Sequence, residues 1–367
     1  MATAMKSPKP YEIQSEKPPE RFARGWHCLG LASEYADGKI HGINIFGTRI
    51  IVFKNADGDL KAMDAWCPHM GADLALGRIE GNSVVCKFHG WAWDSCGGSC
   101  TDIPYAKTIP PKARIKTWEI TEQNQFLFIW NDPEGNPPDP EVAIPRLEQA
   151  YSDEWSDWSV AQWNININCR ELIDNIADMA HFGPVHGGTG TVYFANIFEK
   201  HIATQIMVGT FPNLSENEYL TTVATYYGPA YQITHMYGQM NGIPVESILM
   251  NSHTPDDNDS FTLRFGVIVK KFPGMSDEDC AAMVQGYVDA TNKAFGEDVE
   301  IWHNKVRIDN PLLCDSDGPV LRNRRWYEQF YTDVADLKKS TAERKVLEMD
   351  MGIEDEFRPP IKHAFEA

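Results

Sequence analysis

Two short pairs of metal-binding side chains constrain this chain more than any other feature of its sequence. The segment Cys67–His69 reads C-P-H, and after sixteen further residues Cys86–His89 reads C-K-F-H. Each pair directly follows a strand-like segment, and each is closed by a glycine, Gly71 or Gly90. Glycine lets a backbone bend closely around a bound group. The sequence therefore predicts two loops of a β-structure that hold one metal centre between them.

The mixed composition of the two pairs indicates the type of centre. A Rieske [2Fe–2S] cluster is held by two thiolates on one iron and two neutral imidazoles on the other, so each pair can offer one ligand to each iron. A Cys2His2 zinc site is the alternative, but zinc usually binds one pair of cysteines and one pair of histidines. Cys96 and Cys100 lie nearby, and we expect them to be plain thiols in a glycine-rich turn. The predicted cluster ligands are Cys67, His69, Cys86 and His89.

A second metal motif lies in the middle of the chain. The apolar spacing of Cys169–Phe182 predicts a helix that ends at Gly183-Pro184. Asn175, Asp178 and His181 fall on one side of this helix, and His186 lies just beyond its end. Two histidines and a carboxylate form the facial triad of non-haem Fe(II) oxygenases, which leaves iron positions open for O2 and substrate. Two histidines five residues apart are weak evidence alone, but the first metal motif favours iron here.

The third iron ligand must come from elsewhere in the chain. Ser276 and Asp279 resemble a capping box that opens a long helix, predicted to extend as far as Arg307. Within this helix Asp298 shares an apolar face with Trp302, and a buried acid requires a metal or a partner. We predict that His181, His186 and Asp298 bind the iron, with Glu297 as the second choice for the carboxylate.

The remaining pattern predicts an α+β fold in two parts. Ile43–Phe53 is rich in strand-forming residues, a turn follows at residues 55–58, and Leu60–Ala65 can pair back as a hairpin. Phe126–Trp130 and Phe261–Val269 are further predicted strands. The proline-rich run Asn131–Pro140 is typical of a linker between domains.

Composition excludes several classes of partner and location. Lys and Arg total 33 against 52 Asp and Glu, so the chain carries a formal charge of −19 and is unsuited to nucleic acid. No apolar run is long enough to span a membrane, and Met1–Arg21 lacks the apolar stretch of a signal peptide. We expect a cytoplasmic protein whose 8 cysteines are thiols or metal ligands.

These motifs, together with several longer segments, carry a family resemblance that covers nearly the whole chain. The chain resembles the Rieske non-haem iron oxygenases, and within them the oxygenase components of 3-ketosteroid 9α-hydroxylases. Beyond the metal motifs the likeness includes Arg24–Gly30, Gly135–Pro140, Asp174–Phe182 and Glu246–Leu249. The more specific likeness is carried by three segments of the C-terminal third: Asp298–Trp302, Arg307–Leu313 and Arg325–Glu328.

The resemblance implies the organisation, cofactors and partners of the protein. It implies an N-terminal all-β Rieske domain at residues 1–140, with its core at about 24–131, and a C-terminal helix-grip catalytic domain at residues 141–367. Each chain would hold one [2Fe–2S] cluster and one mononuclear Fe(II), with O2 as co-substrate. The expected assembly is a head-to-tail homotrimer in which Asp178, with Asn175 beside it, links His89 or His69 of one subunit to His181 of the next. An NADH-dependent reductase with flavin and a plant-type [2Fe–2S] cluster would supply electrons.

The resemblance implies O2-dependent hydroxylation of a 3-ketosteroid at C9. Another bulky apolar substrate, or another steroid carbon, is the alternative, because the glycine-rich segment 187–191 beside the iron motif departs from the family pattern. A Rieske electron carrier is the alternative from another class, and the second metal motif argues against it. Six apolar or aromatic residues are candidates for the substrate pocket: Phe194, Tyr231, Met236, Tyr237, Met240 and Trp302.

Overall fold

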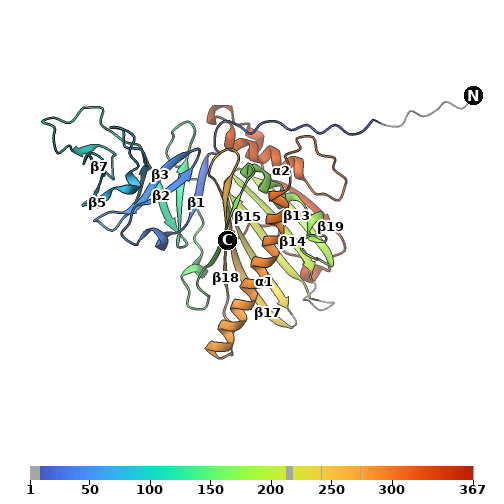
Figure 1. The fold of residues 1–367 in the computed structure, drawn as a ribbon. Helices are drawn as coiled ribbons and strands as arrows, with labels where there is room; N and C mark the ends of the chain where they lie inside the picture. The colour runs from blue at the N-terminus through green and yellow to red at the C-terminus, as the bar shows by residue number, and fades with distance from the viewer. Residues whose placement is uncertain (1–8, 212–217, 241, 273, 367) are drawn as a thin grey trace, which may run out of the picture.

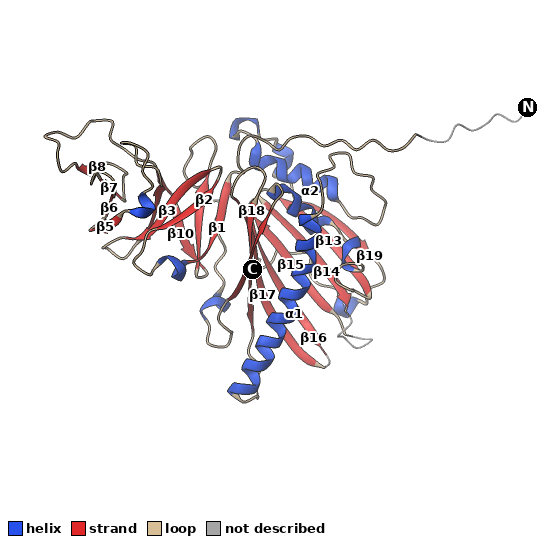
Figure 2. Cartoon of the chain, viewed as in Figure 1, coloured by secondary structure: helices blue, strands red, loops and turns tan. Residues whose placement is uncertain are grey.

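The computed structural model describes residues 9–211, 218–240, 242–272 and 274–366. Figure 1 shows two bodies side by side, small sheets from the N-terminal third on the left and one large sheet with helices on the right. Strands dominate both bodies, and helices occur mainly in the second, as Figure 2 shows by colour, so the predicted α+β class is confirmed. Residues 1–8, part of the segment for which we predicted no signal peptide, lie outside the described residues.

The N-terminal body contains three small antiparallel sheets. The first has the order β1 (Gly25–Leu31), β11 (Phe126–Asn131), β10 (Ile120–Gln123). The second has the order β2 (His41–Ile45), β3 (Thr48–Lys54), β4 (Leu60–Asp64), β9 (Thr117–Trp118). The third has the order β5 (Arg78–Glu80), β6 (Ser83–Val85), β7 (Ala92–Asp94), β8 (Cys100–Asp102), and it lies at the end farthest from the large sheet (Figure 1).

Most predicted strands of this body are confirmed. β3 pairs antiparallel with β4 across the turn at residues 55–58, and the strand predicted at Phe126–Trp130 is β11. The stretch Ile43–Phe53 is divided between β2 and β3, because Phe46 and Gly47 take φ angles of 53° and 67° and turn the chain back.

The second body is built on an eight-stranded antiparallel sheet. Its order is β12 (Ser159–Ile165), β18 (Phe261–Val269), β17 (Ile243–Pro255), β16 (Tyr231–Met240), β15 (Leu220–Tyr227), β14 (Ile202–Thr210), β13 (Gly190–Glu199), β19 (Lys345–Asp350). The strand predicted at Phe261–Val269 has those bounds as β18. Side chains on successive residues of these strands point to opposite faces, so the sheet has two apolar faces to cover.

Helix α1 (Asp277–His303) lies across one face of this sheet (Figure 2). The predicted cap is confirmed: Ser276 Oγ accepts from the backbone N–H of Asp279 at 3.2 Å. The helix ends at His303 and not at Arg307, because Asn304 leaves the helical conformation and its side-chain amide donates to the Glu300 carbonyl at 2.8 Å. Helix α2 (Val320–Tyr327) lies near the C-terminal end of α1 (Figure 1). Within the described residues, no helix has both the length and the apolar character needed to cross a membrane.

The helix predicted over Cys169–Phe182 is instead two 3-10 segments, η4 (Cys169–Ala177) and η5 (Ala180–Phe182). Asp178 separates them, because its backbone is extended and its carboxylate accepts from the N–H groups of Ala180 (3.0 Å) and His181 (3.3 Å). The other 3-10 segments are η1 (Ala32–Tyr35), η2 (Leu74–Leu76), η3 (Glu148–Tyr151), η6 (Glu328–Tyr331), η7 (Val334–Asp336), η8 (Lys339–Thr341) and η9 (Asp355–Phe357).

The two bodies share a core and several hydrogen bonds. Trp26 and Phe128 of the N-terminal body pack with Tyr231 on the sheet face that α1 does not cover. Thr254 Oγ1 donates to the Cys28 carbonyl at 2.6 Å. The N-terminal segment at Gln14, inside the predicted first domain, bonds to Asn310 of the second. This packing fixes the N-terminal body against the uncovered face of the large sheet.

Candidate metal centres and substrate pocket

The two predicted cluster loops share one backbone design. The N–H of Cys67 donates to the carbonyl of Ala72 at 2.9 Å, and the N–H of Cys86 donates to that of Trp91 at 2.9 Å. The glycine four residues after each cysteine donates back to that cysteine's carbonyl, and Gly71 and Gly90 take φ angles of 75° and 72°. Residues with a Cβ rarely adopt such angles. The glycines therefore allow two matching turns, and the cysteine and histidine side chains of both turns face the same space.

The predicted cluster ligands converge in that space. Cys67 and Cys86 are buried, and their thiols lie close enough that Cys86, after burial, helps raise the pKa of Cys67. The His69 and His89 rings lie beside each other with centroids 4.6 Å apart. Burial disfavours the charged form of a thiol, and binding to a metal favours it. The donor set fits a [2Fe–2S] cluster, and its assignment remains our prediction.

The two other thiols of this region are placed as plain thiols. Cys96 is exposed, whereas Cys100 is buried and its Sγ donates to the carbonyl of Asp102 at 3.4 Å. Both are free cysteines.

The second predicted centre comes together from η5, the following turn and α1. Ligand atoms of His181, His186 and Asp298 all lie within 4.8 Å of one another. His186 is carried back toward His181 by consecutive tight turns, in which the N–H of Val185 donates to the His181 carbonyl at 2.9 Å. Asp298 is 6% exposed on α1, so its carboxylate points into the protein. Two histidines and one carboxylate are the three ligands that a facial iron site requires.

Hydrogen bonds fix the tautomer of His181. Its Nδ1 lies 2.7 Å from the backbone carbonyl of Asp178 and must therefore donate a proton to it. Nε2 then carries the lone pair, and it faces the amide of Asn175 at 3.3 Å. The same amide lies 3.5 Å from Asp298 Oδ2. Asn175 thus contacts two predicted ligands and orients both, while His181 presents the nitrogen that a metal could bind.

The electrostatics around His186 favour a positive charge at this point. Its Nε2 lies 3.3 Å from Asp298 Oδ2, and its Nδ1 lies 3.7 Å from Glu297 Oε2. Burial alone would lower the pKa of His186, but the two carboxylates outweigh burial and raise it above its ordinary value. A divalent cation between Nε2 and Asp298 would satisfy the same field. Glu297 faces the opposite ring nitrogen, which is the place of a hydrogen-bond partner and not of a ligand.

Asp178 lies at the edge of this site. Its carboxylate is 39% exposed, and Oδ2 lies 3.8 Å from His181 Nδ1. Burial would raise its pKa, but His181 and the two backbone N–H groups outweigh burial and lower it. The ionised carboxylate can therefore accept a further hydrogen bond from outside this chain.

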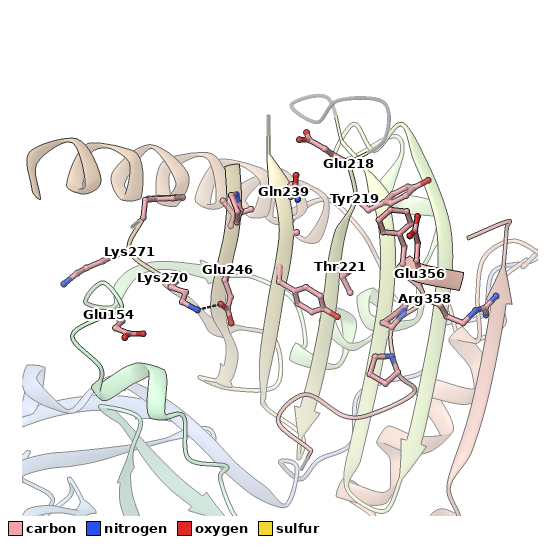
Figure 3. A pocket seen from close by; sticks show the side chains of 18 residues that line it. Glu154, Glu218, Tyr219, Thr221, Gln239, Glu246, Lys270, Lys271, Glu356 and Arg358 are labelled. Carbon is pink, nitrogen blue, oxygen red and sulfur yellow. Dashed lines mark hydrogen bonds and ion pairs between the residues drawn. The ribbon is translucent and has the colours of Figure 1, made fainter. Parts of the chain in front are cut away.

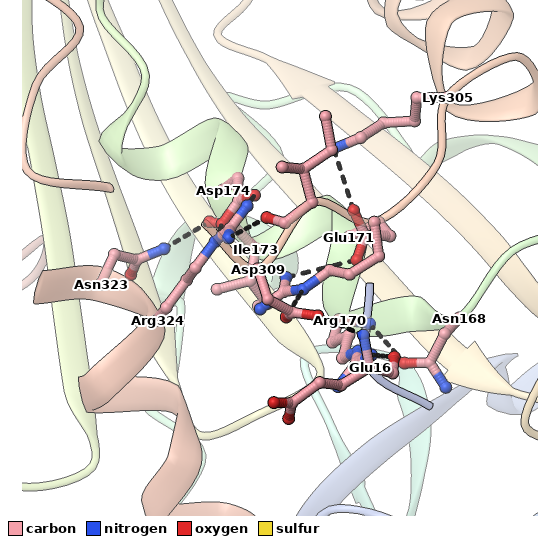
Figure 4. A network of polar contacts seen from close by, with 12 residues as sticks. Glu16, Asn168, Arg170, Glu171, Ile173, Asp174, Lys305, Asp309, Asn323 and Arg324 are labelled. Atoms are coloured by element: carbon pink, nitrogen blue, oxygen red, sulfur yellow. Dashed lines mark hydrogen bonds and ion pairs between the residues drawn. The ribbon is translucent and has the colours of Figure 1, made fainter. Parts of the chain in front are cut away.

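A polar network behind η4 holds the site together (Figure 4). Glu171 is 1% exposed, and its carboxylate lies 3.2 Å from Lys305 Nζ and 3.3 Å from Arg307, both just after α1. Asp174 accepts from Arg324 of α2 at 2.9 and 2.6 Å. The network joins η4, which carries Asn175, to the chain that follows Asp298, so it fixes the two halves of the site relative to each other.

An apolar pocket of about 450 Å³ opens between α1 and the sheet face that α1 covers. Its side of α1 is the side of Asp298, because Ala294, one helical turn before Asp298, lines it. The hydroxyl of Tyr287, one of its lining residues, lies 2.8 Å from Ser247 Oγ of β17. The lining residues are Phe211, Leu220, Met236, Met240, Ile243, Val245, Phe272, Met283, Gly286, Tyr287, Ala290, Thr291 and Ala294.

The six residues predicted for the pocket are distributed over the sheet. Met236 and Met240 line the apolar pocket. Tyr231 and Tyr237 lie on the opposite face, where Tyr231 packs with Phe128, because neighbouring residues of β16 alternate between faces. Trp302 is buried against Phe295 of the same helix, with ring centroids 5.7 Å apart. Phe194 is buried in β13, in one cross-strand row with Met236.

A larger groove of about 1110 Å³ lies on the face opposite α1 (Figure 3). Charged side chains such as Lys270 and Glu246, 2.9 Å apart, line it together with Tyr237. Because Asp298 belongs to α1, this groove lies across the sheet from the predicted iron ligands. The smaller, apolar pocket is therefore the better candidate for a substrate.

Sequence reasoning missed the helix side of the pocket. Met283, Tyr287, Ala290 and Ala294 recur every three or four residues, which is one face of a helix. Following that helical spacing from Asp298 back toward the start of the helix would have identified these four residues. Ser247 had no such signal, because its role depends on which strand lies under Tyr287.

The two predicted centres lie far apart within one chain. The cluster loops lie at the tip formed by β5 and β7, at the far left of Figure 1, whereas η4, η5 and α1 belong to the second body on the right. No described segment of this chain brings His69 or His89 to the Asp178 carboxylate.

Comparisons with known proteins identify both parts of the chain. Residues 25–119 match the Rieske [2Fe-2S] domain, and residues 129–331 match the 3-ketosteroid 9α-hydroxylase C-terminal domain. A 3-ketosteroid-9-alpha-monooxygenase oxygenase component of Rhodococcus rhodochrous is 47% identical over 348 residues, covering 92% of this chain and 89% of the relative. The protein of the same name from Mycobacterium tuberculosis is 45% identical over 358 residues, covering 94% of this chain and 91% of the relative. Crystalline dicamba monooxygenase bound to dicamba has the same fold, with a TM-score of 0.69 at 19% identity, over 84% of this chain and 98% of that one.

Proposed function

This chain belongs to the family of 3-ketosteroid 9α-monooxygenase oxygenase components, and we propose that it is the terminal oxygenase that hydroxylates a 3-ketosteroid at C9 with O2. As an oxygenase component it takes electrons from a separate reductase. We propose that this reductase uses NADH and carries flavin and a plant-type [2Fe–2S] cluster.

One observation carries this proposal: His181, His186 and Asp298 converge within 4.8 Å, and α1, which supplies Asp298, also lines an apolar pocket, in a chain that has a Rieske domain. A Rieske electron carrier would need only the first centre. The second centre gives the chain a place to activate O2 next to an organic substrate, which favours an oxygenase over a carrier.

The residues of the two centres have distinct proposed roles. Cys67, Cys86, His69 and His89 hold the [2Fe–2S] cluster. His181, His186 and Asp298 hold one mononuclear Fe(II), which supplies O2 activation when bound. Asn175 orients His181 and Asp298 through its side-chain amide. The Glu297 carboxylate, 3.7 Å from His186 Nδ1, favours the tautomer whose Nε2 is free for iron.

Electron transfer is proposed to run between subunits of a homotrimer. Two observations support this. The centres are distant within one chain, and the Asp178 carboxylate is 39% exposed while it accepts a hydrogen bond from the backbone N–H of His181. A carboxylate in that position can accept a hydrogen bond from a cluster histidine of the neighbouring subunit. Burial of the contact in the assembly would protect it from water.

The pocket suits a large apolar substrate with few polar groups. Its volume of about 450 Å³ is within the usual range for small-molecule sites, and most of its lining residues are apolar. Apolar burial must supply most of the binding, at about 25 cal/mol per Å². The Ser247–Tyr287 pair uses one hydroxyl proton between its two oxygens, so one O–H remains for a ligand acceptor such as a ketone oxygen.

A bulky substituent at C17, or a different apolar substrate, is the second reading for the same site. The observation that favours it is the lack of side chains over residues 187–190 apart from Thr189. A Cβ built on Gly188 would lie 3.7 Å from Phe211, which lines the pocket. This segment therefore leaves the Phe211 ring room to move outward for a larger ligand.

The test is turnover with a defined set of substrates. The purified protein, its reductase and NADH are mixed with a 17-keto-3-ketosteroid, a 3-ketosteroid bearing a long C17 side chain, and a non-steroidal terpenoid. O2 uptake is measured, and products are identified by mass spectrometry and NMR. We expect 9α-hydroxylation of at least one 3-ketosteroid, three iron ions per chain, and no product from Asp298→Ala.

Tyr287→Phe tests the polar contact in the same assay. It removes the hydroxyl and keeps the ring, so KM for 3-ketosteroids should rise several-fold while the product stays the same. Coupled turnover of the terpenoid alone would overturn the substrate class. Two iron ions per chain and no turnover of any substrate would instead favour an electron carrier.

A further inference from the structure

The two predicted cluster histidines have unlike surroundings. The His69 ring is covered by the Trp91 indole, with centroids 4.5 Å apart and planes 12° from parallel. The His89 ring has Phe88 as its neighbour, at 3.8 Å, and Phe88 is 60% exposed. Both histidines are half-buried, but His69 lies behind the half-buried Trp91, whereas His89 lies at an edge formed by the exposed Phe88. The centre therefore has two different approaches.

The covered approach leads to the surface in a single further step. Trp91 Nε1 donates to the hydroxyl of Tyr105 at 2.7 Å, and Tyr105 is 62% exposed. An unbroken series of one hydrogen bond and one ring stack therefore joins solvent to His69. No other exposed aromatic side chain of the described residues reaches a cluster histidine through such a hydrogen bond and stack.

The segment around Tyr105 also has a charge unlike that of the rest of the chain. Residues 103–118 contain Lys107, Lys112, Arg114 and Lys116 and no acidic side chain, although the whole chain is at −19. Lys107 and Lys112 are exposed, and among the described residues neither forms an ion pair. Arg114 is engaged by the Gly97 carbonyl at 2.8 Å, and Lys116 lies over the Trp118 ring at 3.3 Å. Lys107 and Lys112 are therefore the cations available to a partner.

We propose that residues 103–116, with Tyr105 at the centre and Lys107 and Lys112 beside it, form the docking surface for the electron-donating protein, and that this donor presents an acidic face. The rest of this acidic chain repels such a donor, so the basic segment selects the one approach that ends at His69. The donor's reduced centre would give up the one electron that the bound cluster, for which His69 is a proposed ligand, would accept. The open edge at Phe88 and His89 is left for the neighbouring subunit. The proposal rests on the Rieske function proposed above.

The first experiment reverses the two available charges. The double variant Lys107→Glu with Lys112→Glu is compared with Lys338→Glu with Lys339→Glu, an equal change at two exposed lysines of the second body. Association with the purified reductase is measured by surface plasmon resonance at low ionic strength and at about 0.5 M salt, where screening extends only a few Å. At low ionic strength we expect the first variant to associate at least tenfold more slowly, and the control within twofold of the parent. At high salt the difference should nearly vanish.

The second experiment separates docking from the state of the cluster. Tyr105→Ala removes an uncharged contact, so it should weaken binding of the reductase equally at both salt concentrations. Stopped-flow reduction by the reductase should slow in both variants, whereas reduction by dithionite and the EPR signal should stay as in the parent. Missing EPR signals in the parent protein would contradict the Rieske function itself.

Two results would overturn the docking proposal. The first is association of the Lys107→Glu/Lys112→Glu protein at the parental rate at low salt. The second is a change in subunit assembly, seen as a smaller particle mass and slower single turnover of pre-reduced enzyme, with association to the reductase unchanged. That second result would make residues 103–116 a contact between copies of this chain.

Discussion

The substitution Glu171→Gln tests whether the network behind η4 holds the iron site. Glu171 is 1% exposed and contacts Lys305 Nζ at 3.2 Å and Arg307 at 3.3 Å. Glutamine has nearly the same shape, so the cavity does not change. It replaces one of the two carboxylate oxygens by an NH2 group, so one acceptor oxygen remains for two cations that only donate, and the NH2 group faces the other cation. The substitution therefore removes an attraction and introduces a repulsive pair of donors.

The expected loss can be worked from these contacts. A hydrogen bond to a charged group contributes about 1.5–3 kcal/mol. The side chains of Lys305 and Arg307 remain 28% and 16% exposed, so both cations recover part of their hydration when the carboxylate charge is lost. We expect the free energy of unfolding to fall by about 2–3 kcal/mol, below the 3–5 kcal/mol of a fully desolvated pair. Because η4 also carries Asn175, the Kd for Fe(II) should rise by about tenfold.

The assay is a urea titration of the parent and the variant, with far-UV circular dichroism as the signal, and a separate Fe(II) titration. Glu80→Gln is the matched control, because Glu80 contacts Arg78 at 2.6 Å with both side chains more than half exposed. The control should lose less than about 0.5 kcal/mol and bind Fe(II) as the parent does. If Glu171→Gln behaves like the control, the buried network does not position the iron site.

The remaining predictions address the two centres directly. Cys67→Ser should abolish the reduced-state EPR signal and the red-brown colour, and a coloured, EPR-active variant would show that Cys67 is not a cluster ligand. Asp298→Ala should lose one iron per chain while the EPR signal persists, whereas Glu297→Ala should retain that iron with about tenfold weaker affinity; the reverse pattern would exchange the two roles. Asp178→Asn should be reduced at the cluster at the parental rate yet form product at least a hundredfold more slowly, and normal product formation would exclude Asp178 from the path between subunits.

The sequence predicted those features that depend on short spacing. The cysteine and histidine pairs, the cap at Ser276 and the strand Phe261–Val269 are each defined by residues within one turn, one loop or one strand. Local backbone geometry decides such features, so tertiary packing has little room to change them. The helix predicted at Cys169–Phe182 shows the limit of this reasoning. Its apolar spacing is helical, but the Asp178 carboxylate competes for two backbone N–H groups and divides it.

Features that depend on two distant segments were harder to predict. The choice between Glu297 and Asp298 required the direction of α1 relative to the histidines, and adjacent helix residues differ by about 100° in direction. The structure places Asp298 beside His186 Nε2 and Glu297 beside Nδ1, so the two acids face different nitrogens of the same ring. The spacing of residues along the helix does not give the position of the His186 ring.

The pocket shows the same limit in a strand. Met236 and Tyr237 are neighbours in β16, yet one lines the apolar pocket under α1 and the other lines the groove on the opposite face. Composition favoured both equally, because each is a large side chain with substantial apolar surface. Only the pairing of Met236 with Ser247 on β17 decides between them, since Ser247 faces Tyr287 of α1. The lining of this pocket therefore depends on strand register, because a shift of β16 by one residue would exchange the two faces and put Tyr237 under α1 in place of Met236.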